Sequence, residues 1–450
     1  MTLARLAERL RSRELSPREA VQSYLDRIEA AAGLNAFISV RAEEALAEAA
    51  SAPDGPLHGV PVAIKDVIDV AGARTTAASR ILRDNVASRD AEAVARLRAA
   101  GAIVLGKLNT HEFAFGALTT SMHFGPARNP WSRDRICGGS SGGSGAAVAA
   151  DLAAGTLGTD TAGSIRIPAC FCGVTGLRPS AGLVPNGGVV PVSWRFDTVG
   201  PIARSAEDCS LLLQALVPLY RPELDGGVRE LRIGVVEHLF ERAEPEIAAC
   251  ARSAVDELGS LGARVEPVVV PLLEEAGTVV QTMMLPEAAQ AHLGWLRTRL
   301  PEYGPDVRVR LLAGLLLPST AYVTGLRALR WYLNELSPVF ERFDLLAHPA
   351  MPVIPPRIGE ETVSLHEEQV PYRLSLIPFN SPWTLAGAPV ASVPCGFVSG
   401  LPAGLALVGR PFAEATVLRA AATLQRATDW HERRPERTVG DPEGRSAIPT

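Results

Sequence analysis

Three side chains in this sequence have the types and spacing needed for acyl transfer. Ser140 and Ser164 lie in two turns of small residues, at 138–145 and 159–164, which an apolar segment joins. A serine hydroxyl attacks a carbonyl carbon when a base takes its proton, and a neutral lysine amine can be that base. We expect the two turns to fold back against each other, bringing both serines into one site with Lys65.

Lysine is rare in this chain, which makes Lys65 conspicuous. Of 44 lysine and arginine residues only two are lysines, Lys65 and Lys107. Lysine can lose its proton when it is desolvated, whereas arginine in practice cannot. Lys65 follows an apolar, β-branched run within residues 60–70, which predicts a buried strand and favours a neutral amine. The alternative is a lysine whose stem is buried while its ammonium group reaches solvent.

The glycine–serine turn allows other interpretations. The letters GGSSG at 138–142 match G-x-S-x-G, but that elbow needs a strand directly before it, and residues 129–136 are polar and contain a proline. No G-K-[ST] follows, so a phosphate loop is disfavoured. On composition alone, the glycine–serine turn could also be a flexible linker. The apolar segment 146–157 that follows it, which we expect to be a buried helix, favours a buried turn instead. Each serine by itself could simply cap a helix or close a turn.

Composition limits the classes of function. The chain has 450 residues, which suggests two or three units, and a net charge of −5, which argues against nucleic acid or an anionic membrane as the main partner. It starts without an apolar signal segment and holds no run of eighteen uncharged apolar residues, so we expect a cytoplasmic protein. The six cysteines are scattered, and Cys170 and Cys172 lack a second pair at zinc spacing. We therefore expect no metal site and cysteines that pack as small apolar groups.

Helical and strand patterns alternate through the central part of the chain, which predicts the α/β class. Residues 1–50 read as helices, with a capping box from Ser16 to Glu19. Residues 231–270 read as a strand–helix–strand unit and residues 271–345 as mainly helical. The remaining predicted elements are helices at 90–100, 205–216 and 413–427 and strands at 102–105, 391–397 and 404–408.

Three segments resemble the amidase signature family. They are GVPVAIKD at 59–66, GGSSGGS at 138–144 and GTDTAGSIRIP at 158–168, and the two serines keep the family interval of 24 residues. The similarity is close over 55–215, weaker over 379–434 and thin over 220–375.

The resemblance implies the amidase-signature fold, a central mixed β-sheet flanked by helices on both faces. It also suggests how the chain is divided. The expected segments are an N-terminal helical arm (1–50), a signature core with the catalytic residues (51–220), a variable βαβ and helical region covering the site (221–375), a C-terminal part completing the core (376–436) and a loose tail (437–450).

The resemblance further implies a Ser–Ser–Lys triad that needs no cofactor. Ser164 would be the nucleophile that forms an acyl-enzyme. Ser140, joined to Gly139 by a cis peptide bond, would relay the proton. Lys65 would be the base, with a depressed pKa. Backbone N–H groups would form the oxyanion hole, and the expected donors belong to Thr161, Ala162, Gly163 and Ser164.

Ala162 departs from the family pattern, which commonly has glycine there; we expect its methyl group to narrow the pocket rather than to strain the backbone. The remaining substrate-site candidates are Gly139, Ser141, Ala114 and Met122. Phe113 and Phe115 would continue an apolar wall with Ala114 and Met122, and ordinary core packing is the alternative for all four. We expect Asp160 and Arg166 to support the nucleophile turn as an ion pair.

The implied reaction is hydrolysis of a carboxylic or urea-like amide to a carboxylate and ammonia or an amine. The alternative is a glutamine-hydrolysing A subunit of a tRNA-dependent amidotransferase, which would need partner chains. The resemblance implies an aspartate after Phe412 in glutamine-using members, and Ala413 at this place weakens that alternative. A catalytically silent scaffold is a third hypothesis. The expected partner is a small amide, with no direct nucleic-acid or membrane partner, and the resemblance is compatible with a homodimer.

Overall fold

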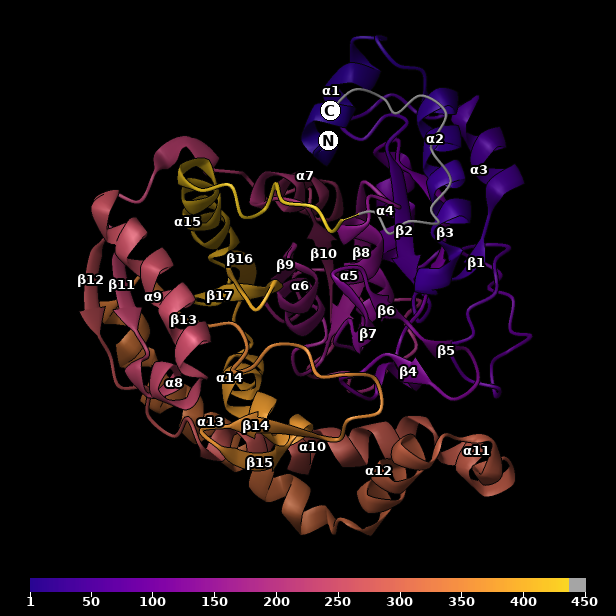
Figure 1. Cartoon of the computed structure of the whole chain (residues 1–450). Helices are drawn as coiled ribbons and strands as arrows, with labels where there is room; N and C mark the ends of the chain where they lie inside the picture. The colour runs from indigo at the N-terminus through magenta and orange to yellow at the C-terminus, as the bar shows by residue number, and fades with distance from the viewer. Residues whose placement is uncertain (437–450) are drawn as a thin grey trace.

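A computed structural model describes residues 1–436, so the predicted tail at 437–450 lies outside the described part. One sheet of eleven strands runs through the molecule, from β1 on one side to β12 on the other (Figure 1). The strands, in their order across the sheet, are β1 (Phe37–Val40), β3 (Ile103–Leu108), β2 (Pro61–Lys65), β8 (Gly155–Asp160), β10 (Thr198–Ala203), β9 (Thr175–Arg178), β16 (Val390–Val398), β17 (Leu401–Gly409), β13 (Leu345–Pro349), β11 (Arg232–Val235) and β12 (Arg264–Pro267).

The sheet is mixed. Strands β3, β2 and β8 run parallel, as do β13, β11 and β12, and the neighbours between and outside these groups pair antiparallel. The predicted α/β class is therefore confirmed.

Fifteen α-helices surround the sheet in the described residues. They are α1 (Leu3–Arg11), α2 (Pro17–Ala30), α3 (Ala42–Ala49), α4 (Glu92–Ala99), α5 (Gly142–Ala149), α6 (Arg166–Cys172), α7 (Ala206–Leu216), α8 (Glu237–Arg242), α9 (Pro245–Ser260), α10 (Glu275–Ala291), α11 (Leu293–Thr298), α12 (Pro305–Leu316), α13 (Ser319–Arg342), α14 (Tyr372–Leu385) and α15 (Glu414–Ala427). Short hairpins join β4 (Thr120–Ser121) to β5 (Gly125–Pro126), β6 (Arg128–Asn129) to β7 (Ser132–Ile136) and β14 (Thr362–Leu365) to β15 (Glu368–Pro371).

Helices cover both faces of the sheet, and two glycines of β8 show this. Successive residues of a strand point to opposite faces, so Gly155 and Gly158 face opposite ways. A Cβ at Gly155 would meet Leu212 of α7, whereas a Cβ at Gly158 would meet Ser141 and Ile165, which flank α5 and α6. The strand that leads to the candidate site is thus enclosed between α7 and the α5–α6 pair.

Two predicted elements are wrong in part. The apolar segment 146–157 is not one helix: α5 ends at Ala149, the chain turns at Asp151 with φ of 55°, and β8 follows. A short apolar run does not distinguish a buried helix from a buried strand by itself. Residues 1–50 are also not helical throughout, because β1 pairs with β3 at the edge of the sheet.

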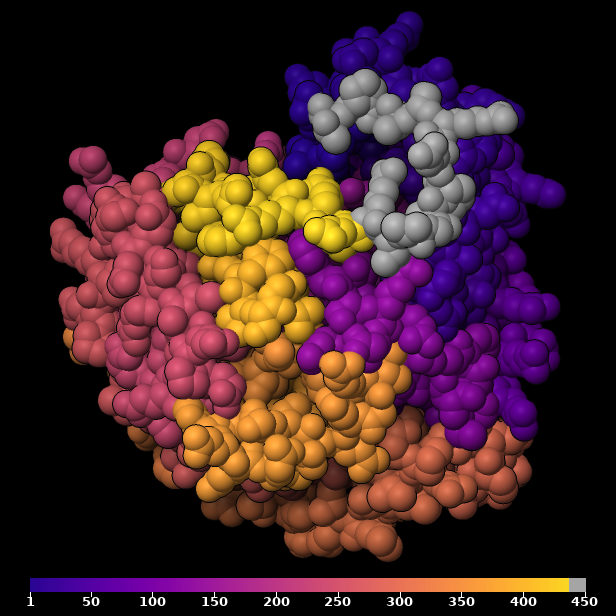
Figure 2. Space-filling view, viewed as in Figure 1, coloured from indigo at the N-terminus to yellow at the C-terminus, as the bar shows by residue number. Residues whose placement is uncertain are grey.

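Most other predicted elements are confirmed. The strand–helix–strand unit is β11, α9 and β12, with the two strands parallel. The capping box at Ser16 is present at the start of α2. The helical segment α10–α13 forms the lower rim of the molecule in Figure 2.

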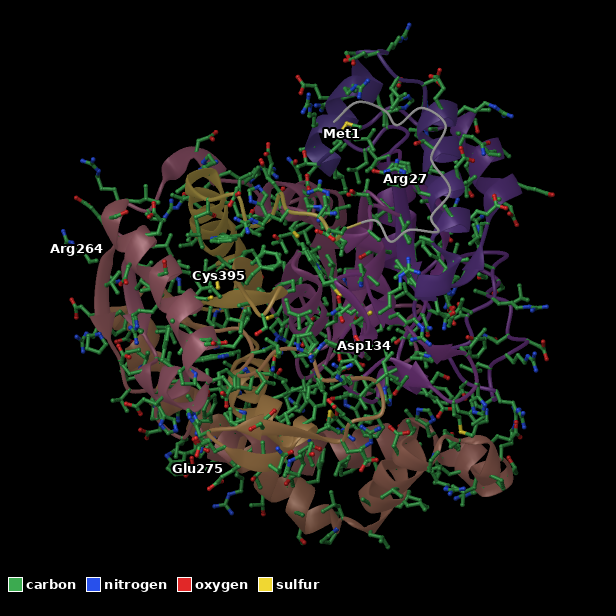
Figure 3. The ribbon with its side chains drawn as sticks, in the orientation of Figure 1. Met1, Arg27, Asp134, Arg264, Glu275 and Cys395 are labelled. Atoms are coloured by element: carbon green, nitrogen blue, oxygen red, sulfur yellow. The ribbon has the colours of Figure 1, made fainter. Side chains whose placement is uncertain are left out.

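No single helix within residues 1–436 has both the length and the apolar character of a membrane span. Only α12 and α13 taken together reach that length and apolar character, and the two helices are bent by 93° relative to each other. The six cysteines are free, and all except Cys250 are buried. Cys395 on β16 lies among packed side chains of the interior (Figure 3).

Candidate active site

Lys65 ends β2, which is buried between β3 and β8. The side chain has no exposed surface, so the alternative of an ammonium group in solvent is wrong. Its Nζ donates to Ser140 Oγ at 2.7 Å and to Thr159 Oγ1 at 2.7 Å. The lysine therefore lies against the first serine turn.

The partners of Lys65 in the described part of the chain are hydroxyl and carbonyl oxygens. Burial lowers the pKa of Lys65 to about 7, although the negative charges of Asp160 and Asp197 partly oppose this effect. A substantial fraction of the amine is thus neutral near pH 7, as a general base requires. Lys107 differs, since its Nζ lies 3.0 Å from a buried carboxylate oxygen of Asp66.

The backbone around Ser140 is fixed by the segment that precedes β4. The Gly139–Ser140 peptide bond is cis. The Ser140 carbonyl oxygen accepts from the His111 N–H at 3.1 Å, from Thr110 Oγ1 at 2.8 Å and from Thr119 Oγ1 at 3.1 Å. Three donors on one carbonyl oxygen leave this turn little freedom to move.

The two serine turns lie side by side, as their spacing predicts. The Ser141 N–H donates to the Ser164 carbonyl oxygen at 3.2 Å, and Ser141 Oγ donates to the Thr159 carbonyl oxygen at 3.1 Å. Ser140 and Ser141 are fully buried, and Ser164 is 8% exposed. The structure thus brings Lys65, Ser140 and Ser164 into one small region, with Ser164 the most accessible of the three.

Asp160 organises the turn that carries Ser164. Its carboxylate accepts from the Gly163 N–H at 2.8 Å and pairs with Arg166 at 2.9 Å and with Arg178 at 3.0 Å. Burial by itself would raise the pKa of Asp160, but the two guanidinium charges hold it well below its usual range. The pair of Asp160 with Arg166 was expected from the sequence. The pair with Arg178 was not expected, because Arg178 lies on a different strand, β9.

Removing the Asp160 carboxylate should destabilise the fold. In Asp160→Ala, Arg166 and Arg178 stay buried without a counter-charge, and we expect the free energy of unfolding to fall by about 3–5 kcal/mol. Urea denaturation measures this change. Asp134, labelled in Figure 3, is the control, because its pair with Arg357 is half-exposed and its loss should change stability by less than about 1 kcal/mol. Equal effects in the two variants would contradict the structural role of Asp160.

Of the four backbone N–H groups expected to form an oxyanion hole, one already has an acceptor. Because the Gly163 N–H already donates to Asp160, it is occupied in this structure. Within residues 1–436, the N–H groups of Thr161, Ala162 and Ser164 have no acceptor. Gly163 has φ of 114° and would place a Cβ 2.6 Å from Asn380 Oδ1, so only glycine fits there. Ala162 is not among the described residues with positive φ, so its methyl group adds bulk without backbone strain.

A polar chain behind this turn was not visible in the sequence. Thr161 Oγ1 donates to Asp197 Oδ1 at 2.6 Å, and Asp197 Oδ2 accepts from the Val192 N–H at 2.8 Å. Ser193 Oγ in turn donates to the buried carboxylate of Glu287 on α10. Burial raises the pKa of Asp197 to about 6. This chain of contacts links the turn that carries Ser164 to α10.

The residues expected to form an apolar wall beside the site differ in burial: Phe113 and Ala114 are buried, whereas Met122 is exposed. Phe113 is buried edge-on against His292, with ring centroids 4.4 Å apart, and stacks near Trp295, which agrees with core packing. Ala114 is buried beside it. Met122 is 66% exposed and lies at the surface near Gly304, the residue before α12.

Comparisons with known proteins extend over almost the whole chain. A family model described as Amidase matches residues 19–418. The A subunit of the glutamyl-tRNA(Gln) amidotransferase of Moorella thermoacetica is 39% identical over 487 aligned positions, which cover 97% of this chain and 98% of that protein.

Two solved structures have nearly the same fold. One, described as an unexpected vestigial protein complex that reveals the evolutionary origins of an s-triazine catabolic enzyme, is 36% identical with a TM-score of 0.90 and covers 95% of this chain and 98% of its own. The other, a crystal structure of an amidase, is 33% identical with a TM-score of 0.90 and covers 95% and 100%. The predicted arrangement of a mixed sheet between helical layers is confirmed.

Proposed function

This chain belongs to the amidase signature family of hydrolases that act on C–N bonds, and from that premise we propose that it hydrolyses a carboxylic or urea-like amide through an acyl-enzyme. The products are a carboxylate and ammonia or an amine. The observation that carries the proposal is the 2.7 Å hydrogen bond between the buried Lys65 Nζ and Ser140 Oγ, in a turn that packs on the Ser164 turn.

In the acylation step, neutral Lys65 takes the proton of Ser140 Oγ while Ser140 takes the proton of Ser164 Oγ. The Ser164 oxygen attacks the amide carbon, and the carbonyl oxygen becomes negatively charged. We expect the N–H groups of Thr161, Ala162 and Ser164, which have no acceptor within residues 1–436, to stabilise that charge. The proton on Lys65 returns through Ser140 to the leaving nitrogen as the C–N bond breaks.

In the deacylation step, a water molecule attacks the ester carbonyl of the acyl-Ser164. Its proton passes to Lys65 by way of Ser140, and the same N–H groups stabilise the second tetrahedral intermediate. When that intermediate collapses, the proton returns to Ser164 Oγ and the carboxylic acid is released. The base and the relay therefore act in both halves of the reaction without net consumption.

One observation favours a second function, glutamine hydrolysis as the A subunit of an amidotransferase: the 39% identity to such a protein over nearly the full length of both chains. Against it, Ala413 precedes α15 where the family resemblance implies an aspartate for the α-amino group of glutamine. A methyl group offers that ammonium no hydrogen-bond acceptor. We therefore place this function second.

Ammonia release by the purified chain alone tests the two functions against each other. The panel contains aliphatic, aromatic and urea-like amides together with glutamine. Turnover of a non-glutamine amide supports a stand-alone amidase. Turnover of glutamine alone, or activity that appears only with partner chains, supports the amidotransferase function.

The pH dependence of turnover should report Lys65. Only the neutral amine accepts a proton, so kcat/KM should rise with pH, following an apparent pKa of about 7, and fall about tenfold per pH unit well below it. The negative charge of Asp197 raises the pKa of Lys65, so Asp197→Asn should move this limb to lower pH. A kcat/KM that is constant from pH 5 to pH 8 would contradict the role of Lys65.

A further inference from the structure

Glu287, on α10, is a buried carboxylate whose two oxygens each accept a hydrogen bond from a hydroxyl group. Oε1 accepts from Tyr322 OH of α13 at 2.7 Å, and Oε2 accepts from Ser193 Oγ. The Glu287 side chain is 1% exposed, and the Nε of the partly exposed Arg195 lies 3.8 Å from Oε1, beyond hydrogen-bond distance. Burial of a carboxylate is unfavourable unless hydrogen bonds and charges compensate it, so packing alone would favour an uncharged residue at this place.

Ser193 joins this carboxylate to a second one. Its Oγ donates to Glu287, whereas its N–H donates to Asp197 Oδ2 at 3.0 Å. The Val192 N–H donates to the same oxygen at 2.8 Å, and the Asp197 N–H donates to the Ser193 carbonyl oxygen at 2.9 Å. These bonds close residues 192–197 into one tight turn. The place at which Glu287 holds Ser193 therefore sets the position of the Asp197 carboxylate.

The other oxygen of Asp197 holds the turn that carries Ser164. Thr161 Oγ1 donates to Asp197 Oδ1 at 2.6 Å, and both residues are buried, so water competes little for this bond. Thr161 directly follows β8, and its N–H is one of the expected oxyanion donors that have no acceptor within residues 1–436. A donor stabilises an oxyanion best when its direction is fixed before the reaction. The hydroxyl bond to Asp197 provides such a restraint on Thr161.

Other contacts hold the backbone of the turn at 192–197 without Glu287. Asn186 Nδ2 donates to the Asp197 carbonyl oxygen at 2.7 Å, and Arg178 Nη2 donates to the Phe196 carbonyl oxygen at 3.1 Å. These bonds remain when Glu287 is replaced, so we expect the turn to keep its path. Glu287 adds the position of the Ser193 end, and with it the direction of the Asp197 carboxylate.

We propose that Glu287 is a positioning residue for the oxyanion hole: through Ser193 and Asp197 it holds Thr161 so that its N–H faces the oxygen that becomes negatively charged. This inference rests on the proposed amidase function and adds a residue of α10 to it. Glu287 itself does not contact the substrate. Its loss should therefore slow the attack on the carbonyl carbon and leave substrate binding unchanged.

The separation of kcat from KM tests this role. Glu287→Ala should lower kcat by about 10- to 100-fold and keep KM within about threefold of the wild type. Glu287→Gln keeps an oxygen acceptor at the same place, so kcat should return to within about fivefold of the wild type. Rates are divided by the amount of Ser164 that reacts to completion with a fluorophosphonate, so that loss of folded enzyme cancels. A rise in KM with unchanged kcat would overturn the positioning role.

Asp208→Ala is the matched control. Asp208, on α7, is also a fully buried carboxylate held by hydrogen bonds, since it accepts from the Ala4 N–H at 2.9 Å and from the Ser205 N–H at 3.2 Å. It has no contact with the Thr161 turn among these bonds. Its removal should lower the melting temperature and leave the normalised kcat within about threefold of the wild type. An equal loss of kcat in Asp208→Ala and Glu287→Ala would mean that the effect is one of stability alone.

A double-mutant cycle tests the route of the effect. Thr161→Val removes the hydroxyl that binds Asp197 and keeps the N–H group. In this background Glu287→Ala should lower kcat by less than about threefold, because the connection is already broken. Ser193→Ala removes the hydroxyl that binds Glu287, should by itself lower kcat by about tenfold, and serves as the test if Glu287→Ala does not fold. Effects that multiply fully in these cycles would overturn the proposed route.

Reaction with the fluorophosphonate gives a rate that does not depend on the identity of the amide. Ser164 Oγ bonds to phosphorus, fluoride leaves, and the serine proton passes through Ser140 to Lys65, while the phosphoryl oxygen gains negative charge. Slower labelling of Ser164 in Glu287→Ala, without turnover of any amide by the wild type, would refute the proposed hydrolysis and keep the positioning role. Amide turnover with unchanged kcat and labelling rate in Glu287→Ala and Ser193→Ala would overturn the positioning role and keep the hydrolysis.

Discussion

Replacing Ser164 by alanine should lower amide turnover by a factor of at least about 10⁴, because the attacking oxygen is removed and no acyl-enzyme can form. The change deletes one atom from a residue that is 8% exposed and whose carbonyl oxygen, not its hydroxyl, accepts from Ser141. The fold should therefore remain, as circular dichroism and the melting temperature can verify. Ammonia release under saturating substrate measures the loss.

The matched control for this variant is Ser144→Ala. Ser144 lies in the neighbouring glycine–serine segment, which carries Ser140; it is fully buried, and its Oγ has no hydrogen-bond partner within residues 1–436. Its removal should leave turnover within about threefold of the wild type, since no satisfied polar contact is lost. Comparable losses in Ser144→Ala and Ser164→Ala would mean that turnover is lost on any loss of a serine hydroxyl in these two turns, and the assignment of Ser164 as nucleophile would lose its support.

Lys65→Met and Lys65→Arg should both lower kcat by at least about 10³-fold. Methionine removes the base, and arginine keeps the charge but cannot release its proton near pH 7. A charge at this position is therefore expected to be insufficient for turnover. Single-turnover kinetics would locate the loss in the acylation step. Turnover near the wild-type rate in Lys65→Arg would show that the amine is not a base.

Lys107→Arg is the control for this pair of variants. Lys107 is equally buried, but its partner is the Asp66 carboxylate at 3.0 Å, and an arginine can keep that charge pairing. The larger side chain should reduce stability by about 1–3 kcal/mol. Turnover per folded molecule should nevertheless stay well above that of Lys65→Arg, which separates the need for a charge from the need for a removable proton.

Local sequence features predicted the parts of the site that depend on a few neighbouring residues. The apolar run before Lys65 predicted a buried strand end, and the structure has one in β2. The small residues around Ser140 and Ser164 predicted two close turns, which the hydrogen bond from Ser141 to Ser164 joins. Turns of small residues and buried apolar strands depend on the residue types within one short segment, so both could be predicted without knowing which distant segments pack against them.

Features that depend on distant segments were not predictable in this way. Arg178 completes the Asp160 cluster only because β9 and β8 both pair with β10. The occupied N–H of Gly163 follows from the direction in which the Asp160 carboxylate points. Segment 146–157 was misassigned because an apolar run fits a buried strand as well as a helix.

The central claim is a covalent intermediate on Ser164, and the most direct measurement is the mass of the protein during turnover. The enzyme is mixed with an anilide that it hydrolyses, quenched in acid within milliseconds to seconds, digested and mapped by mass spectrometry. The account predicts that the peptide containing Ser164 gains the mass of the acyl group, and that the gain is absent in Ser164→Ala. An acyl group on any other residue, or none during a measured burst of aniline, would contradict it.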